Sequence, residues 1–290
     1  MARKAYDRAV DRTGRRRFLR IGAALGLGAP ALDAFAIEPL WLDVNRLVVD
    51  VPGLPSELDG FTIAHVTDVH ISSIGRIHRA LARAIGEASP DLVVLTGDVI
   101  DVAARVDIVT EFVGALRSGR AQVIATLGNW EHWGGVNLGV LAERYARAGA
   151  RLLTNESVVV DRGLAVVGTD DGSSTLADLR RSFRGVAEDR PRLLLTHAPG
   201  ILEDRVPPTA RAALTLAGHT HGGQVRALSR AIIVPPGSGS FVAGSYATAV
   251  GPLYVSRGIG MSRIPARFAC RPELPILRLR RGEAARIVES

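Results

Sequence analysis

The sequence predicts a layered α/β fold, in which β-sheet and helices pack against each other. Apolar runs of four to six residues, the length of buried strands, alternate with longer stretches of helical periodicity. Polar residues suited to metal binding follow directly after several of these runs. With 290 residues, 47% of them hydrophobic, the chain can bury one sizeable core, and one domain over residues 37–290 is the simplest expectation.

The hydrophobic pattern assigns the main elements of this fold. The expected buried strands span residues 61–66, 92–95, 123–127, 192–195 and 214–217. The expected helices span residues 77–88, 106–116 and 138–148. A hairpin is expected where the tripeptide DRG separates residues 157–160 from 164–167, and the tail from Leu274 alternates like a half-exposed strand.

The positive charge of the chain is concentrated near its N-terminus. Residues 1–36 contain eight basic and three acidic residues, so they hold five of the seven net positive charges. The rest of the chain lacks the basic surplus of a nucleic-acid-binding protein, and we expect no nucleic-acid partner. The single cysteine, Cys270, excludes an intrachain disulfide and a cysteine-based metal site, and we expect it to be a buried apolar residue.

Residues 1–36 are interpreted as a twin-arginine export signal. The hexapeptide RRRFLR at residues 15–20 resembles the consensus R-R-x-F-L-K, and an apolar stretch and an A-x-A cleavage pattern at residues 34–36 follow it. The stretch, residues 21–32, is shorter than the roughly 20 residues of a membrane-spanning helix. The expected partner is the twin-arginine export machinery, and the expected location is the periplasm or the extracytoplasmic face of the membrane. The leader is either cleaved or kept as a short anchor, and membrane association is expected only through the leader or a lipid substrate.

Five predicted strands end in residues that can bind metal. They are followed by the motifs DVH, GD, GN, TH and GHTH, which contain Asp68, His70, Asp98, Asn129, His197, His219 and His221. Because the ends of neighbouring strands bring their loops into one crevice, we expect a single site. Asp68 and His70 are separated by one residue, as are His219 and His221, so an extended backbone would point each pair toward one face.

The chemistry of these seven residues predicts two divalent metal ions. Carboxylate, imidazole and amide oxygen ligands without thiolate suit Mn, Fe, Zn or Co. Seven donors are too many for one tetrahedral ion and match two ions that share a bridging carboxylate.

The order of the motifs resembles the calcineurin-like metallophosphoesterases, whose pattern is D-x-H, G-D, G-N-H-[DE], H and G-H-x-H. Here the motifs read DVH, GD, GNWE, H and GHTH. The segments PDLVVLTGDVID, LAGHTHGGQV and YVSRGIGMSRIPARFACRPEL are similar to a YkuE-like exported phosphodiesterase subgroup. The resemblance implies a two-sheet β-sandwich flanked by helices, with the metal site at the C-terminal ends of the strands. It assigns one ion to Asp68, His70 and His221, the other to Asn129, His197 and His219, and the bridge to Asp98.

One position departs from the family pattern. The histidine after the asparagine, which protonates the leaving group in the family, is Trp130 here, and His132 lies two positions further on. In one alternative His132 takes this role, which makes Asp98, Asn129 and His132 the candidate catalytic residues. In the other, protonation is lost and the enzyme prefers substrates with acidic leaving groups.

The expected function is hydrolysis of a phosphodiester or phosphoanhydride, lipid- or nucleotide-linked, by a metal-bridging hydroxide. The substrate class rests on analogy with the subgroup, and an exported location favours a lipid head group. The alternative is a catalytically weak metal- or phospholigand-binding envelope protein that kept the metal cage. Three arginines contact substrate phosphate or anionic lipid, or lie in a solvated loop: Arg257, Arg263 and Arg267.

Other polar residues have less specific interpretations. His65, inside a predicted strand, is expected to be hydrogen-bonded in the core, and His78, at the start of a predicted helix, to be solvated. Asp170 and Asp171 follow another strand and either reach the site or form a turn.

Overall fold

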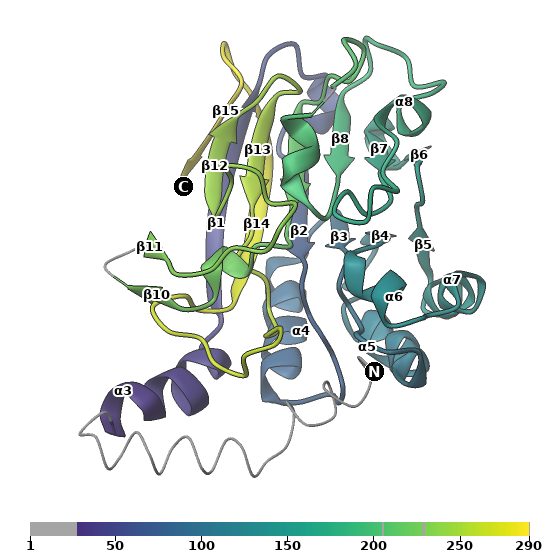
Figure 1. Ribbon diagram of the computed structural model, residues 1–290. Helices are drawn as coiled ribbons and strands as arrows, with labels where there is room; N and C mark the ends of the chain where they lie inside the picture. The colour runs from purple at the N-terminus through teal and green to yellow at the C-terminus, as the bar shows by residue number, and fades with distance from the viewer. Residues whose placement is uncertain (1–27, 205, 228–229, 290) are drawn as a thin grey trace.

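The computed structural model describes residues 28–204, 206–227 and 230–289, in which two β-sheets stack between layers of helices (Figure 1). The sandwich that the family resemblance implied is therefore confirmed. The five strands expected to carry the site are divided between the two sheets, three in the first and two in the second.

The first sheet contains both parallel and antiparallel neighbours. Its order is β15 (Arg286–Glu289), β1 (Asp43–Val51), β14 (Glu273–Arg281), β2 (Thr62–Val66), β3 (Leu92–Thr96), β4 (Gln122–Thr126) and β5 (Ala150–Leu152). Strands β2 to β5 run parallel, and β14 is antiparallel to β2.

The second sheet is built in the same way around four parallel strands. Its order is β12 (Gly244–Ala247), β13 (Pro252–Val255), β9 (Leu214–Ala217), β8 (Arg192–Leu195), β7 (Ala165–Gly168) and β6 (Glu156–Val159). Strands β13, β9, β8 and β7 run parallel, and β6 and β12 are antiparallel edges. A short hairpin of β10 (Arg226–Ala227) and β11 (Arg230–Ala231) lies outside both sheets.

The helices of the described residues are α3 (Gly28–Leu32), α4 (Arg76–Ala88), α5 (Ile108–Ala115), α6 (Asn129–Trp133), α7 (Leu138–Arg147) and α8 (Leu179–Ser182). Four of the helices cover the outer faces of the sandwich, whereas α3 lies below the sheets and α6 lies at the strand ends (Figure 1). Apolar residues of α4, α5 and α7 pack on the first sheet, and α8 packs on the second.

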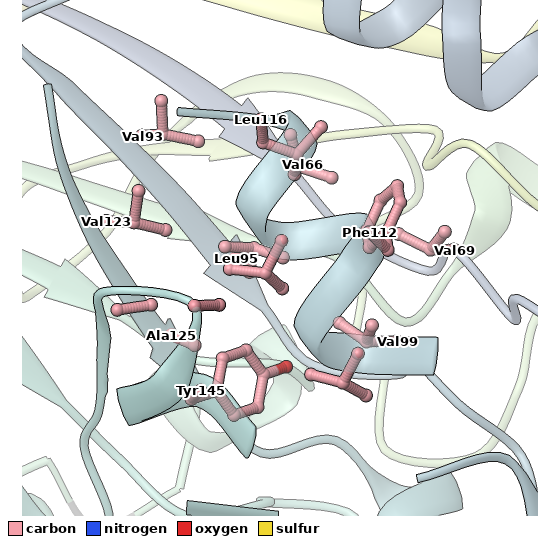
Figure 2. Packing of buried hydrophobic residues seen from close by; sticks show 14 of the residues in the cluster. Val66, Val69, Val93, Leu95, Val99, Phe112, Leu116, Val123, Ala125 and Tyr145 are labelled. Carbon is pink, nitrogen blue, oxygen red and sulfur yellow. The ribbon is translucent and has the colours of Figure 1, made fainter. Parts of the chain in front are cut away.

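The central strands of each sheet are buried on both faces, whereas the edge strands β6, β12 and β15 are partly exposed. Val93 and Leu95 of β3 point toward the helices (Figure 2), whereas Leu92 and Val94 face the second sheet. A strand that packs on both sides needs apolar residues at consecutive positions. This is why the site strands were recognisable as short, predominantly apolar runs.

The strand register brings the site loops to the same level. Val66 pairs with Leu95 in the first sheet, and Leu195 pairs with Leu216 in the second. The loops that begin after these residues therefore leave the two sheets side by side, at the C-terminal ends of their parallel strands.

The predicted elements are present, with several differences. The DRG tripeptide connects β6 and β7 as an antiparallel hairpin, with Arg162 in a left-handed conformation (φ 59°). The tail strand β14 is not half-exposed along its length: its first five residues are buried because it lies inside the sheet, between β1 and β2. Among the strands of the two sheets, the hydrophobic pattern did not reveal β1, β5, β12, β13 or β15.

Two histidines outside the ligand set occupy buried or half-buried places. His65 is buried, and its Nε2 lies 2.8 Å from Thr96 Oγ1, as expected of a core histidine. The expectation that His78 is solvated is wrong. Its Nδ1 accepts a hydrogen bond from Gly75 N at 2.9 Å, and its ring packs edge-on against Phe112 of α5, which stabilises the start of α4.

The N-terminal segment packs against the body of the molecule. After α3, the chain continues through a π-helical turn (Asp33–Ile37) and a 3-10 turn (Glu38–Leu40). Ala34 O accepts a hydrogen bond from Arg267 N at 2.9 Å, and the buried Glu38 carboxylate accepts from Ala269 N and Cys270 N. The predicted cleavage pattern at residues 34–36 thus lies in a helical, packed segment. The twin-arginine hexapeptide lies outside the described residues.

None of the helices within the described part of the chain combines the length and apolar character needed to cross a membrane.

Candidate metal centre

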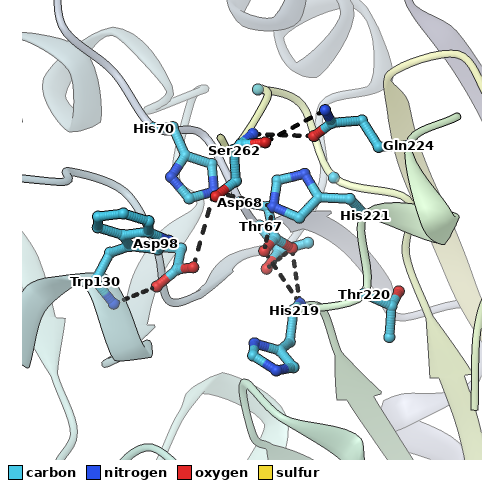
Figure 3. Close-up of polar contacts among 12 residues, drawn as sticks. Thr67, Asp68, His70, Asp98, Trp130, His219, Thr220, His221, Gln224 and Ser262 are labelled. Atoms are coloured by element: carbon cyan, nitrogen blue, oxygen red, sulfur yellow. Dashed lines mark hydrogen bonds and ion pairs between the residues drawn. The ribbon is translucent and has the colours of Figure 1, made fainter. Parts of the chain in front are cut away.

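The seven side chains predicted as metal ligands come together where loops of the two sheets meet. Figure 3 shows Asp68 and His70, from the loop after β2, beside His219 and His221, from the loop after β9. Asp98 follows β3, Asn129 begins α6 after β4, and His197 follows β8. All seven therefore belong to one site.

Most of these residues have an unusual backbone conformation. Positive φ angles between 47° and 70° occur at Asp68, His70, Asp98, His219 and His221. Such angles are uncommon for residues other than glycine and are typical of functional sites that the surrounding structure holds in place. The paired ligands thus do not lie on extended backbone, as their spacing suggested. They reach one site because the chain turns sharply after each strand.

Gly218 allows the loops from the two sheets to approach each other. A Cβ atom at this position would lie 2.0 Å from Thr67 Oγ1 and 2.3 Å from Asp68 Oδ2. With glycine there, His219 N can donate to the Asp68 carboxylate at 2.9 Å. The first ligand motif is therefore fastened to the last one by a direct hydrogen bond.

One group of candidate ligand atoms contains Asp68, His70 and His221, all within 4.8 Å of one another. His70 Nε2 lies 3.0 Å from His221 Nε2, which is 3.4 Å from Asp68 Oδ1. The other ring nitrogen of His70 contacts Asp101. A carboxylate in this position orients the imidazole and leaves Nε2 directed at the group.

A second group contains Asp68, Asp98 and His197. Nε2 of His197 lies 3.2 Å from Asp98 Oδ2, 3.1 Å from Asn129 Oδ1 and 3.2 Å from His219 Nδ1. Among the three residues that the family resemblance assigns to a second ion, His197 thus contacts both of the others, beside Asp98.

Two carboxylates connect the groups. Asp68 belongs to both. Asp98 Oδ2 lies 3.2 Å from His197 Nε2 and 3.8 Å from His70 Nε2, so it is within reach of both ends of the site. This position is compatible with the bridging role expected of Asp98, which remains a prediction.

The hydrogen bonds around the second group leave unshared electron pairs facing each other. Thr96 O accepts from His197 Nδ1 at 2.7 Å, and Pro236 O accepts from His219 Nε2 at 2.8 Å. A carbonyl oxygen cannot donate, so the nitrogens that face each other, His197 Nε2 and His219 Nδ1, are the ones free to take a cation or an added proton. The buried Nδ1 of His221 has no partner among the described residues. This donor set fits a divalent cation.

The electrostatics of the protein alone agree with this fit. Burial would lower the pKa of His70, but the adjacent Asp101 carboxylate raises it to about 9. Burial would also lower the pKa of His197, but the adjacent Asp98 carboxylate raises it well above its usual value. Burial holds the pKa of His221 well below the usual range. Protons on His70 and His197 supply positive charge that bound metal ions would replace.

Glu131 is a supporting residue to which the sequence analysis gave no role. Its buried carboxylate lies 2.7–3.4 Å from the backbone nitrogens of Gly128, Asp98, Val99 and Ile100, and accepts their hydrogen bonds. It thereby ties the loop after β3 to the loop after β4. Gly128 and Glu131 have the three-residue spacing of a capping box, a signal that could have revealed this role. No comparable signal marked Asp101.

Trp130 and His132 lie on different sides of α6. The Trp130 ring packs edge-on against His70 at 6.2 Å, and its backbone nitrogen donates to Asp98 Oδ1 at 2.8 Å. His132 instead points to Asp170, with 2.7 Å between Nε2 and Oδ1. On a helix, His132 shares a face with Asn129, three residues before it. His132 is thus on the Asn129 side of the helix, whereas Trp130 lies beside the first group.

The two aspartates after β7 have different roles. Asp170 faces His132, as just described. Asp171 forms a turn, because its carboxylate accepts hydrogen bonds from Ser173 N and Ser174 N. The turn interpretation thus applies to Asp171, whereas Asp170 contacts His132, whose role in the site remains a prediction.

The arginines considered as phosphate contacts also differ. Arg267 is fully buried and donates to the carbonyl oxygens of Gly260, Gly258 and Cys270, so it is neither solvated nor available to substrate. Arg257 forms ion pairs with Asp43 and Glu273. Arg263 is exposed. Cys270 is buried and free, as expected, and its Sγ contacts His221 O at 3.2 Å.

A two-sheet sandwich with carboxylate, imidazole and amide ligands at its strand ends defines the class of metallophosphoesterases. Comparison with protein families agrees: a model described as calcineurin-like phosphoesterase matches residues 61–223, more than half of the chain. The chain belongs to the calcineurin-like phosphoesterase family.

Individual relatives are similar over nearly their whole length. Metallophosphoesterase YkuE of Bacillus subtilis (strain 168) is 28% identical over 288 residues, covering 93% of this chain and 99% of YkuE. Phosphodiesterase YaeI of Escherichia coli (strain K12) is 30% identical over 276 residues, covering 91% of this chain and 98% of YaeI. A metallophosphoesterase of Aquifex aeolicus (strain VF5) is 26% identical over 267 residues, with 87% and 97% coverage.

Proposed function

We propose that this protein is a dinuclear metal-dependent phosphoesterase that hydrolyses a phosphodiester or phosphoanhydride. The observation that carries the proposal is the pair of overlapping ligand groups, which share Asp68 and have Asp98 between them. A single group of three ligand residues would hold one ion. Two groups in contact provide for two ions with a shared carboxylate.

In this function the metal ions would activate the reacting groups, and neighbouring residues would hold the metal ligands in position. The bound ions would polarise the phosphoryl oxygens and lower the pKa of a water molecule that attacks phosphorus. Asp101 orients His70, and the carbonyl oxygens of Thr96 and Pro236 orient His197 and His219. These contacts hold the ligand atoms in place before substrate binds.

The proposed substrate class is a diester or anhydride with an acidic leaving group, lipid- or nucleotide-linked. The name of the relative YaeI, a phosphodiesterase, supports a diester. Trp130 supports the acidic leaving group, because an indole beside His70 cannot transfer a proton to an alkoxide. His132, held by Asp170, is the competing candidate for this proton transfer.

We further propose that the protein acts outside the cytoplasm after export by the twin-arginine pathway. The hexapeptide RRRFLR and the apolar stretch after it support this location. A substrate available there, such as a lipid head group, fits the proposal better than a cytoplasmic nucleotide conjugate.

A second function is favoured by one observation. Because Trp130 occupies the position of the family's catalytic histidine, the protein could have kept the metal cage and lost turnover. It would then be a metal- or phospholigand-binding envelope protein.

Hydrolysis of bis(4-nitrophenyl) phosphate distinguishes the two functions. We expect the metal-stripped protein to be inactive, and added Mn²⁺ to restore turnover. His219→Ala should abolish this turnover, whereas His78→Ala, a histidine on α4 that is not one of the seven predicted ligands, should retain it. Metal binding without any turnover would support the second function, and neither binding nor turnover would contradict both.

A further inference from the structure

Exposed apolar side chains are concentrated on one part of the surface. Of the eleven large apolar side chains that are strongly exposed among the described residues, eight lie within residues 32–44, at 232–233 and at 264. Six of these eight side chains, each 46–66% exposed, form what we call the apolar face: Ile37, Leu40, Trp41, Ile232, Ile233 and Ile264. Contiguous exposed apolar surface on a folded protein indicates an interaction site.

Hydrogen bonds connect the three segments that carry this face. Gln224 Nε2 donates to Ile264 O at 2.6 Å, and Ile232 N donates to Val225 O at 3.2 Å. Arg267 N, in the loop that also contains Ile264, donates to Ala34 O at 2.9 Å. Figure 1 shows the result: α3, the β10–β11 hairpin and the loop after β13 lie at the same lower left corner of the molecule.

The apolar face borders the metal centre. Gly260 N, four residues before Ile264, donates to Asp68 O at 2.6 Å, and Ser262 N donates to Gln224 Oε1 at 2.9 Å. Figure 3 shows Ser262 and Gln224 next to His70 and His221. The loop that carries Ile264 therefore lies at the rim of the site.

The exposed charge around this face is mostly positive. Its N-terminal segment contributes three acidic residues, of which Glu38 is buried and Asp43 pairs with Arg257, which leaves Asp33. Between Asp204 and Glu273 the sequence contains no acidic residue. Arg230 and Arg263 are exposed and form no ion pair with any described residue, and exposed Arg271 lies over the Trp41 ring at 3.6 Å. Cations beside exposed aliphatic and indole side chains are the combination that binds an anionic lipid surface. Face-to-face contact with a second copy would instead bring these arginines together.

The sequence before the face agrees with a lipid surface. The first described residues, α3, continue directly from the apolar stretch that begins at residue 21 and from the basic hexapeptide before it. A chain held to a bilayer at that point would have the apolar face close to the lipid.

We propose that the apolar face docks on an anionic lipid bilayer, with Ile232, Ile233, Ile264 and Trp41 entering the interface and the nearby arginines contacting lipid phosphate. This docking is separate from any attachment through the leader and does not depend on hydrolysis. It would direct the rim of the metal centre toward the lipid head groups.

Fluorescence of a probe on the full chain tests this proposal. Ile233→Cys is labelled with the polarity-sensitive dye NBD, and Val159→Cys on β6, an exposed apolar residue away from the face, serves as the matched control. Native Cys270 is buried and should not react. Vesicles contain phosphatidylcholine and phosphatidylglycerol at 3:1, or phosphatidylcholine alone.

With the anionic vesicles, the probe at position 233 should shift to the blue and brighten severalfold, and the probe at position 159 should not change. Phosphatidylcholine vesicles should give a much weaker response. Ile232→Asp in the labelled Ile233→Cys chain should reduce the response at a given lipid concentration roughly tenfold.

The leader could bind vesicles by itself, but such binding would not determine which face of the folded protein enters the lipid. A chain that sediments with vesicles while position 233 remains in water contradicts the proposal, and so does a chain that does not sediment. Equal responses at positions 233 and 159 also contradict it. A response without vesicles that grows with protein concentration would show that a second copy covers the face.

Discussion

Trp130 is the residue on which the proposed preference for acidic leaving groups depends. Transfer of a proton to the leaving group typically contributes about 10²–10⁴-fold to the rate, and only when the leaving group is a poor one. The indole lies beside His70 and offers no such proton. His132, on the other side of α6, is held by Asp170. The two residues therefore give opposite expectations for alkyl substrates.

We expect the wild-type protein to prefer aryl diesters and anhydrides over alkyl esters. Trp130→His should raise the rate on alkyl substrates more than on aryl ones, because it restores a proton donor beside the first ligand group. Rates on a series of diesters with increasing leaving-group pKa would measure this. A wild-type rate that is independent of leaving-group pKa, together with a steep dependence in His132→Ala, would assign the proton transfer to His132.

Glu131 provides a second prediction at the residue scale. Each of its carboxylate oxygens accepts two backbone hydrogen bonds from the loops after β3 and β4. Glu131→Gln replaces one oxygen with an amide group that cannot accept, so buried N–H groups lose their partners at about 1–3 kcal/mol each. Urea unfolding should show a loss of stability in this range or above. Glu87→Gln, at an exposed position on α4, is the control, and equal stability of the two variants would contradict the role of Glu131.

At the scale of elements, the β2 strand contains a histidine that must remain neutral. Burial lowers the pKa of His65 to about 3, whereas the unfolded chain has the ordinary value near 6.5. Between these values the unfolded state binds a proton that the folded state does not. The folded state therefore loses stability as the pH falls from 6.5 toward 3.

The direction of this effect predicts how the stability of the protein depends on pH. From pH 7 to pH 5, His65 should lower the free energy of unfolding by about 2 kcal/mol. The pH dependence of wild type minus that of His65→Gln isolates this contribution, because the other titrating groups are common to both. Parallel stability curves for the two proteins would show that His65 is not neutral and buried as described.

The elements differ in how well the sequence predicts them. Strands β2, β3, β4, β8 and β9 are buried on both faces, so each one is a short, predominantly apolar run with few polar residues in it. Strand β1 is harder to recognise because Arg46 and Asp50 flank its apolar centre, and Asp50 pairs with Arg280 and Arg286. Only the folded structure brings those arginines to it. The division of the strands into two sheets followed from the family resemblance and not from the pattern itself.

The residues of the site also differ in how well the sequence predicts them. Its ligands occupy strand ends, where motif and position agree. Asp101 and Asp170 were harder to assign because a carboxylate that orients a histidine carries no fixed spacing from it. The left-handed backbone of Asp68 and His70 was also hidden, since sequence spacing does not distinguish a sharp turn from an extended strand.

At the scale of the whole molecule, the proposal that the leader directs export can be tested in cells. Replacing Arg15 and Arg16 with lysine should keep the protein in the cytoplasm, because the export machinery reads the arginine pair. Cell fractionation would measure this, and unchanged export would contradict the twin-arginine interpretation.

Since Ala34 is packed and hydrogen-bonded to Arg267, we also expect the exported protein to keep its leader. N-terminal sequencing would detect the alternative, a chain that begins at residue 37.

The central claim is that one site holds two metal ions that share carboxylate ligands, and its most direct test is the metal content of Asp98→Ala. Asp98 lies between His197 and His70, so its removal takes a ligand from the space between the two ions and leaves their repulsion less compensated. Elemental analysis of the reconstituted wild type should find two divalent ions per chain. Asp98→Ala should hold one or none, with turnover of an aryl phosphodiester reduced by orders of magnitude. A variant that retains two ions and a near-normal rate would contradict the two-metal account.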